Sequence, residues 1–261
     1  MMTFTILSKN VPHSKIIGRI AAAVFWVAIW QMICIAVQQE ILIVSPVVVL
    51  QRLWELSGDG GFWLAALNSM LHVLAGFFLG LAAGVILAVL TTSFHFLYEL
   101  LYPLISIIKS TPVVSFIILA LVWLRSEQVP AFTAFLEVTP IVLANVAGGI
   151  EKTDRKLLLM ARAYRFGLAR TVRRVYIPSV MPYFIAACTT GMGLAWKTCI
   201  AAEVLASTDL SVGGHIYDAK VYLETADLFA WTAVVVVMSV ILERIMVALM
   251  KKLGKKYNAV M

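Results

Sequence analysis

Residues 151–178 read EKTDRKLLLMARAYRFGLARTVRRVYIP and separate two long apolar runs. Eight of the chain's 21 Lys and Arg residues lie within positions 151–174. Basic residues accumulate on the cytoplasmic side of membrane proteins, so this stretch is predicted to lie at the cytoplasmic surface between two spans. It is too long for a turn, and its apolar residues recur regularly. We therefore expect a docking surface for a cytoplasmic partner.

Composition predicts an all-α polytopic membrane protein. Of the 261 residues, 62% are hydrophobic and 13% are charged, whereas soluble domains carry about 25% charged residues. Several apolar runs reach about 18 residues or more, the length that an α-helix needs to cross ~30 Å of hydrocarbon. These runs lack the ~10-residue alternation that is typical of a transmembrane β-barrel.

The net charge of +7 indicates membrane topology and not nucleic-acid binding. Sixteen of the 21 Lys and Arg residues lie at three places: before or at the start of the first span, within 151–174, and from Arg244 to Lys256. All three places are predicted to be cytoplasmic, beside anionic lipid headgroups. Membrane lipids are therefore expected partners. The cysteines, which lie in apolar runs without metal-ligand spacing, are expected to be reduced packing residues: Cys34, Cys188 and Cys199.

Six spans are predicted in a single transmembrane domain covering residues 1–261. The expected order is a cytoplasmic tail (1–16), four spans within 17–150 (17–37, 69–91, 100–123, 130–150), a cytoplasmic coupling segment (151–177), two spans within 178–250 (178–205, 228–250) and a second cytoplasmic tail (251–261). The first span resembles a secretory signal, but no small-residue cleavage site follows it, so an uncleaved helix is expected. Six spans place both termini on one side, in agreement with the basic residues at both ends.

Glycine and proline predict how some spans are shaped. Gly76, Gly80 and Gly84 recur every four residues and indicate close helix packing. Pro103 and Pro112 are expected to bend or break the third span. The segment 206–227 is expected to be a polar external loop with solvated acidic residues.

Within the basic stretch, residues 154–174 are predicted to be helical, with Thr153 or Asp154 as the N-terminal cap. The apolar residues recur at i, i+3, i+4 and i+7 and form one stripe: Leu157, Met160, Ala161 and Tyr164. Two interpretations remain open on these residues alone. The helix could fill a groove on a partner, or it could lie on lipid headgroups.

The stretch from Leu159 to Pro178 resembles the cytoplasmic EAA loop of permease subunits of ATP-binding cassette importers. The family pattern is Glu-Ala-Ala, three residues, Gly, nine residues, Ile-x-Leu-Pro. Anchored on Pro178, this chain keeps the spacing and the hydrophobic-x-hydrophobic-Pro end. Met160 and Ala161 take the Ala positions, whereas Leu159 and Arg165 stand where the family has Glu and Gly. Gly167, two residues later, is expected to supply the bend.

Other segments resemble the same family in the same order, over about residues 45–250, and favour its nitrate, sulfonate, taurine and bicarbonate branch. They are Ser45-Pro46, Pro103 with Lys109-Ser-Thr-Pro112, Ala195-Trp196-Lys197 with Ala202-Glu203, and Gly213-Gly214 with Ile216-Tyr217-Asp218-Ala219.

The resemblance implies a multi-pass permease subunit in a bacterial inner membrane, with both termini cytoplasmic. It would import a small anion of the nitrate, sulfonate or taurine kind, or a related organic compound such as a vitamin precursor. A separate ATPase dimer would bind ATP and Mg, a second permease copy would complete a homodimer, and an external binding protein would deliver substrate near 206–227. The residues expected to couple to the ATPase are Leu157, Met160, Ala161, Tyr164, Arg165, Gly167 and Pro178.

Charged residues in or near the spans are the candidate pathway or gate residues, because intramembrane charges face a bundle interior, a partner or a pathway. Lys197 and Glu203 stand six residues apart and are not expected to pair, so each needs another partner, such as Glu137 or the second permease copy. Lys197 is the first candidate for contact with an anionic substrate. The alternative is that these charges join helices at a gate. The full set is Lys109, Glu137, Lys197 and Glu203, with Trp196 as a packing aromatic.

No catalytic residue, metal site or bound cofactor is predicted in this chain, and it is not expected to be an enzyme. It contains no Gly-x-x-x-x-Gly-Lys-Ser/Thr phosphate loop. His72, His95 and His215 do not cluster in sequence with Cys or acidic residues at ligand spacing. A stand-alone secondary transporter or channel is the main alternative, although no inverted repeat is evident. A membrane-embedded enzyme is disfavoured because the spans lack a polar catalytic cluster.

Overall fold

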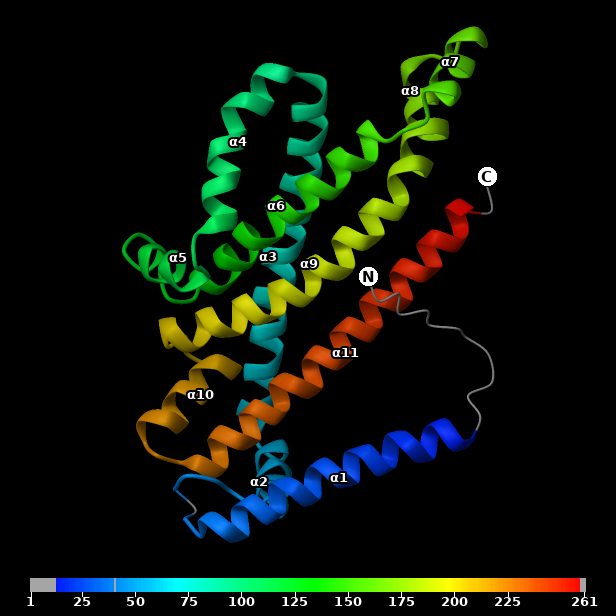
Figure 1. Ribbon diagram of the computed structural model, residues 1–261. Coiled ribbons are helices and arrows are strands. Elements are labelled where there is room, and N and C mark those ends of the chain that lie inside the picture. The colour runs from blue at the N-terminus through cyan, green and yellow to red at the C-terminus, as the bar shows by residue number, and fades with distance from the viewer. Residues whose placement is uncertain (1–12, 40, 259–261) are drawn as a thin grey trace.

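The computed structural model describes residues 13–39 and 41–258, and these residues form helices and connecting turns (Figure 1). This confirms the all-α prediction. Five helices are long and apolar enough to cross a membrane, and one bent helix pair raises the number to as many as six. Most of the predicted N-terminal tail, and residues 259–261 of the C-terminal tail, lie outside the described residues.

The elements in chain order are α1 (His13–Val37), α2 (Pro46–Ser57), α3 (Gly60–Ser93), α4 (His95–Ser110), α5 (Val113–Ala120), α6 (Val129–Glu151), α7 (Arg155–Ala163), α8 (Leu168–Thr171), a π-helical turn η1 (Val172–Tyr176), α9 (Ile177–Ala206), α10 (Val212–Val221) and α11 (Thr225–Asn258).

The centre of the fold is the packing of α6 between α3 and α9. The three glycines of α3 face α6 so closely that an added Cβ would lie 2.6 Å from the Ala134 Cβ at Gly76, 2.7 Å from the Val138 Cβ at Gly80 and 2.6 Å from the Val142 Cβ at Gly84. Small residues allow such close backbone approach in membranes, where dispersion contacts and not the hydrophobic effect hold helices together. The predicted packing role of the glycine stripe is therefore confirmed.

The second span begins nine residues before its predicted start. Asp59 accepts a hydrogen bond from the Gly61 backbone N–H at 3.1 Å, which satisfies a free donor at the first turn of α3. α3 therefore begins at Gly60 and not at Ser69. The capping carboxylate of Asp59 therefore marks the start of this helix.

The third predicted span is a bent pair of helices. α4 and α5 meet at Thr111 and Pro112 at an angle of 102°. Pro112 precedes α5, where its missing N–H removes no intrahelical bond. Pro103, in contrast, lies inside α4 without ending it. Of the two prolines expected to bend or break the span, Pro112 marks the break.

The N-terminal elements attach to the bundle mainly through α11. The Trp30 ring on α1 stacks on Phe229 with centroids 5.9 Å apart. Arg52 on α2 forms a bidentate ion pair with Asp227, and it also bonds Glu55 at 2.9 Å. The hydrogen bonds that Arg52 donates, first to Asp227 and then to Glu55, raise the pKa of its guanidinium. Asp227 was predicted to be a solvated loop charge, but this ion pair leaves its side chain only 14% exposed.

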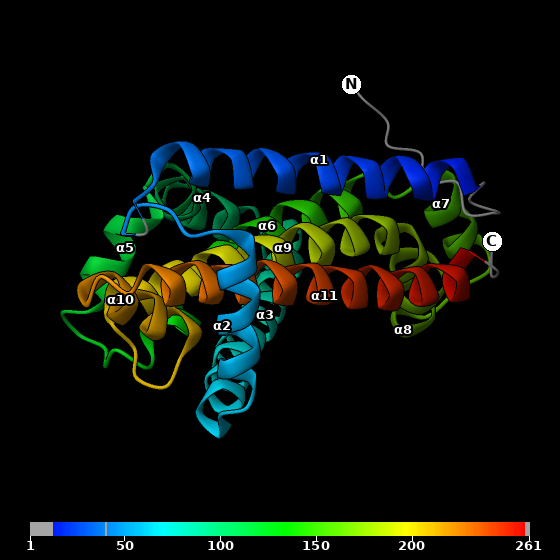
Figure 2. The same ribbon diagram turned by 90° about the horizontal axis from the view of Figure 1, so that it is seen from below.

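The two ends of the bundle differ. In Figures 1 and 2, the described start of α1, the end of α11 and the α7–α8 region lie at one end, while α5 and α10 lie at the other. The segment 206–227, predicted to be a loop, contains the helix α10. Both described chain ends lie at the α7 end of the bundle, which agrees with an even number of membrane crossings.

Candidate functional site

The first candidate site is the surface formed by α7 and the turn that follows it. Asp154 caps α7, because its Oδ1 accepts a hydrogen bond from the Lys156 backbone N–H at 2.8 Å. The predicted cap is confirmed at Asp154. α7 projects beyond the ends of α6 and α9 (Figure 1).

The apolar stripe of α7 is mostly uncovered. Ala161 is 2% exposed and faces the rest of the chain, whereas Leu157, Met160 and Tyr164 are 38%, 43% and 71% exposed. Leu159, at the family's Glu position, is exposed as well. Only one member of the predicted stripe therefore packs inward, and the others form an apolar surface interspersed with basic residues.

A sharp turn ends α7 at Ala163, although the helix was predicted to continue to residue 174. Arg165 has a left-handed backbone with φ of 52°. The Phe166 backbone N–H returns to the Ala161 carbonyl at 2.8 Å, the bond pattern of a glycine-type helix end. The family's Gly position is thus the position that needs a left-handed residue, and here Arg occupies it. Gly167 has φ of −66° and does not supply this bend.

The chain re-enters the bundle through α8, η1 and α9. Pro178 is buried in the first turn of α9, directly after the π-helical turn η1. Because proline has no backbone N–H, it cannot complete the α-helical bond of this turn, which favours the locally wider π geometry. The hydrophobic-x-hydrophobic-Pro sequence therefore forms the junction between the projecting region and a long span.

The second candidate site is a buried carboxylate between α3, α9 and α10. Glu203 is 0% exposed. Its Oε2 accepts hydrogen bonds from Ser69 Oγ at 2.7 Å and from the Gly213 backbone N–H at 3.1 Å, and its Oε1 lies 2.9 Å from His72 Nδ1. Ser69 Oγ in turn accepts a hydrogen bond from the Val212 backbone N–H at 2.9 Å. The carboxylate thus satisfies one amide donor at the start of α10, Ser69 satisfies a second, and the network joins three helices.

Two glycines allow α10 to approach this carboxylate. A Cβ on Gly213 would lie 2.3 Å from the Glu203 Cβ, and one on Gly214 would lie 2.1 Å from the Thr208 carbonyl oxygen. Ser211 caps α10 by accepting a hydrogen bond from the Gly214 N–H at 2.9 Å. Gly213 and Gly214 therefore allow close packing of α10 on the end of α9 and on the turn that follows it.

The other predicted pathway residues are not brought together with Glu203. Lys197 is exposed on α9, Lys109 is exposed in the last turn of α4, and Glu137 is partly buried on α6. Trp196 is 2% exposed within the main apolar core, in agreement with a packing role. The partners of Glu203 are Ser69, His72 and α10, and Glu137 is not among them.

His72 was not predicted to be a partner of Glu203, although the sequence contains a signal for it. His72 stands four residues before Gly76 and so continues the Gly76–Gly80–Gly84 spacing. A polar residue that extends a packing stripe faces neighbouring helices and needs a hydrogen-bond partner there. Within the described ranges, no group of three or more His, Cys, Asp or Glu residues could hold a metal ion.

The described residues thus form a multi-pass helical bundle with a projecting basic helix. Comparison with known proteins defines it further. Residues 80–256 match the family described as binding-protein-dependent transport system inner membrane component, and the chain belongs to this family. It is therefore an inner-membrane, multi-pass permease of ATP-binding cassette transporters, the non-catalytic component, and this membership implies an ATPase partner.

Several relatives are similar over most of the chain. The nitrate import permease protein NrtB of Synechocystis sp. is 24% identical over 78% of this chain and 77% of its own length. The putative aliphatic sulfonates transport permease protein SsuC of Bacillus subtilis is 26% identical over 89% and 85%. Among solved structures, a chain of the MetNI methionine ABC transporter in an inward-facing conformation is similar, with 19% identity, a TM-score of 0.47, and coverage of 76% of this chain and 94% of that one.

Proposed function

We propose that this chain lines the substrate pathway of an importer and that α7 docks into the cytoplasmic ATPase. The observation that carries the proposal is the uncovered apolar surface of α7, formed by Leu157, Met160 and Tyr164. An amphipathic helix that leaves its apolar residues exposed suits a hydrophobic groove on a partner. The buried Ala161, the left-handed turn at Arg165 and the junction at Pro178 fix how α7 is presented.

The α7 end of the bundle is proposed to face the cytoplasm. Eight basic residues of the segment 151–174 gather there, and Lys and Arg favour that side. Both chain termini then lie in the cytoplasm, and α10 lies at the opposite face. We assign that face to the external binding protein that delivers substrate. ATP and Mg bind the ATPase dimer, whose closure moves α7 and, through α8 and η1, the span α9.

A second copy of this chain is proposed to complete the pathway. Lys197 is exposed on a span although a charge facing lipid is costly. A homodimer that places Lys197 at a water-filled interface removes this cost. Glu137 on α6 and Lys109 on α4 are the accompanying pathway or gate candidates. Trp196, buried beside Lys197, holds the α9 face in position.

The proposed substrate is a small anion. Relatives are named for nitrate, aliphatic sulfonates and, for CmpB of Synechococcus elongatus, bicarbonate, all of which are anionic. An exposed Lys197 in the pathway would offset the charge of such a substrate. A related small organic compound, such as a vitamin precursor, is the second candidate, and a ligand screen on the cognate binding protein distinguishes the two.

Reconstitution tests the coupling proposal. In vesicles that contain the permease, its ATPase and its binding protein, Tyr164→Ala should uncouple ATP hydrolysis from uptake. Trp26→Ala is the matched control, because Trp26 is a 67% exposed aromatic residue on α1, a helix assigned to neither the ATPase nor the binding protein. Uptake driven by an ion gradient without any ATPase would instead support a stand-alone secondary transporter or channel and would overturn the proposal.

A substitution at Lys197 tests the pathway proposal. Lys197→Gln should weaken uptake of the anionic substrate, while ATPase binding and the permease yield stay unchanged. Lys251→Gln, at the end of α11, should leave uptake at the wild-type rate. Wild-type uptake and selectivity in Lys197→Gln would remove Lys197 from the pathway.

A further inference from the structure

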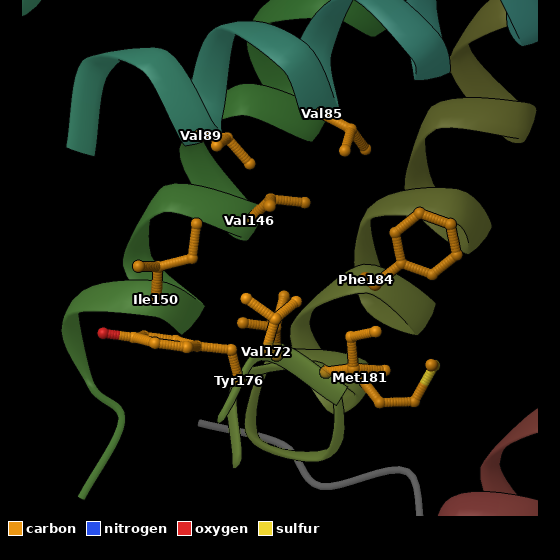
Figure 3. Close-up of a pocket in the computed structure, with 10 residues that line it drawn as sticks. Val85, Val89, Val146, Ile150, Val172, Tyr176, Met181 and Phe184 are labelled. Atoms are coloured by element: carbon orange, nitrogen blue, oxygen red, sulfur yellow. The ribbon is translucent and has the colours of Figure 1, made fainter. Parts of the chain in front are cut away.

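An apolar cavity of about 250 Å³ lies at the α7 end of the bundle (Figure 3). Three helices line it with their end turns. Val89 comes from the end of α3, Val146 and Ile150 come from the end of α6, and Val172 and Phe184 come from η1 and α9. The cavity therefore lies where the spans meet the region that leads to α7 and α8.

Water is not a suitable occupant of this cavity. An ordered buried water needs two to four polar partners, and the lining residues are Val, Ile, Met and Phe together with Tyr176. In Figure 3 the Tyr176 hydroxyl points away from Met181 and Phe184, toward the edge of the group. The chemistry of the lining selects an apolar chain. Within a membrane, lipid acyl chains are the abundant ligands of this kind.

Two basic residues directly follow a cavity-lining residue in the chain. Arg173 and Arg174 follow Val172, a lining residue, and both are exposed. Among the described residues, neither arginine forms an ion pair. Arg170, one turn earlier, instead lies over the Phe166 ring at 5.3 Å. Two exposed arginines therefore stand next in the chain to a residue that lines the apolar cavity.

We propose that this cavity and the two arginines form a binding site for an anionic phospholipid. One acyl chain fills the cavity, and the phosphate of the headgroup binds Arg173 and Arg174. An apolar chain combined with basic residues is the two-signal arrangement that gives stable lipid association. Basic sites of this type between transmembrane helices, on the side facing the cytoplasm, bind anionic headgroups. The bound lipid joins α3 and α6 to η1, the turn that connects α8 to α9.

Lipid retention on the purified full-length chain tests this site without any ATPase. The protein is mixed with equal amounts of phosphatidylglycerol and phosphatidylcholine, and the bound lipids are counted by native mass spectrometry. The wild type should retain phosphatidylglycerol in preference, because the choline cation of phosphatidylcholine offsets the charge of its phosphate. Each arginine near an anionic headgroup contributes about fivefold in affinity, so R173Q/R174Q should lower the preference by about 25-fold. K251Q/K252Q, which removes two exposed lysines at the same end of the bundle, should retain it.

A second variant tests the cavity itself. Val89→Trp fills the cavity from the α3 side and should lower retention of both lipids, whereas Val236→Trp, on an exposed position of α11, should not. Soluble glycerol phosphate should not displace the bound lipid, because it has no acyl chain. Equal retention of the two lipids by the wild type would overturn the proposal, and so would unchanged retention in both variants. If R173Q/R174Q abolishes ATPase binding but leaves lipid retention intact, the arginines serve the ATPase and the lipid site is rejected.

Discussion

His72 Nδ1 on α3 lies 2.9 Å from Glu203 Oε1 on α9, although 131 residues separate them in the chain. Together with Ser69 and the Gly213 N–H, this contact gives a fully buried carboxylate three hydrogen-bond partners. Buried charges are retained where such partners exist, because an unpaired charge is costly in an apolar interior. Glu203 therefore fixes α10 against α3 and α9 at the end of the bundle opposite α7.

Removing this carboxylate should destabilise the fold. Glu203→Ala leaves Ser69, His72 and the Gly213 N–H without their acceptor and should cost about 3 kcal/mol. Glu203→Gln, which keeps the shape and one acceptor oxygen, should cost less. Denaturant unfolding in detergent measures both, with Lys197→Ala as an exposed control on the same helix. Wild-type stability of Glu203→Ala would show that the network does not stabilise the bundle.

The glycine stripe of α3 should not tolerate a methyl group. Gly84→Ala places a Cβ 2.6 Å from the Val142 Cβ and 2.8 Å from the Thr139 carbonyl oxygen, so α3 and α6 must separate. Overpacking of this kind costs about 1–3 kcal/mol. Gly148→Ala is the control, because nothing lies within 4 Å of its Cβ position. Thermal unfolding in detergent should show a loss at Gly84 only, and equal effects of the two changes would contradict the packing.

The left-handed backbone conformation at Arg165 should determine which substitutions there preserve coupled uptake. With φ of 52°, a non-glycine residue there is disfavoured by about 1–2 kcal/mol. Arg165→Gly and Arg165→Asn accept this conformation and should keep coupled uptake, whereas the β-branched Arg165→Val should reduce it. Measurements of uptake and of ATP hydrolysis in reconstituted vesicles rank the three variants by their coupling. If Gly and Asn impair coupling as much as Val does, the Arg side chain and not the turn is what matters.

The ion pair between α2 and α11 should contribute modestly. Arg52 and Asp227 have side chains that are 38% and 14% exposed, so solvent screens their attraction. A double-mutant cycle with Arg52→Ala and Asp227→Ala should give a coupling energy of about 0.5–1 kcal/mol. The coupling should fall as salt is raised. Purely additive effects of the two substitutions would mean that the pair does not stabilise the attachment of α2.

Local features of the sequence predicted much of the fold. Helix type, the number of spans, the cap at Asp154 and the glycine stripe depend on residues a few positions apart, so periodicity and composition indicate them. The helix end at Ala163 was missed because apolar periodicity continues past it. A left-handed Arg165 gives no compositional signal, although its match to the family's Gly position marked the place.

Apolar length and charge act locally along the chain, so the order of residues is enough to predict an all-α polytopic membrane protein with a basic segment between two spans. Which polar groups meet depends instead on the tertiary structure. The partners of Glu203, the pairing of Arg52 with Asp227, and the joining of three helix ends around one apolar cavity all depend on how helices cross and in what register. Close contacts between residues that are far apart in the chain set these helix crossings, and no local spacing predicts them.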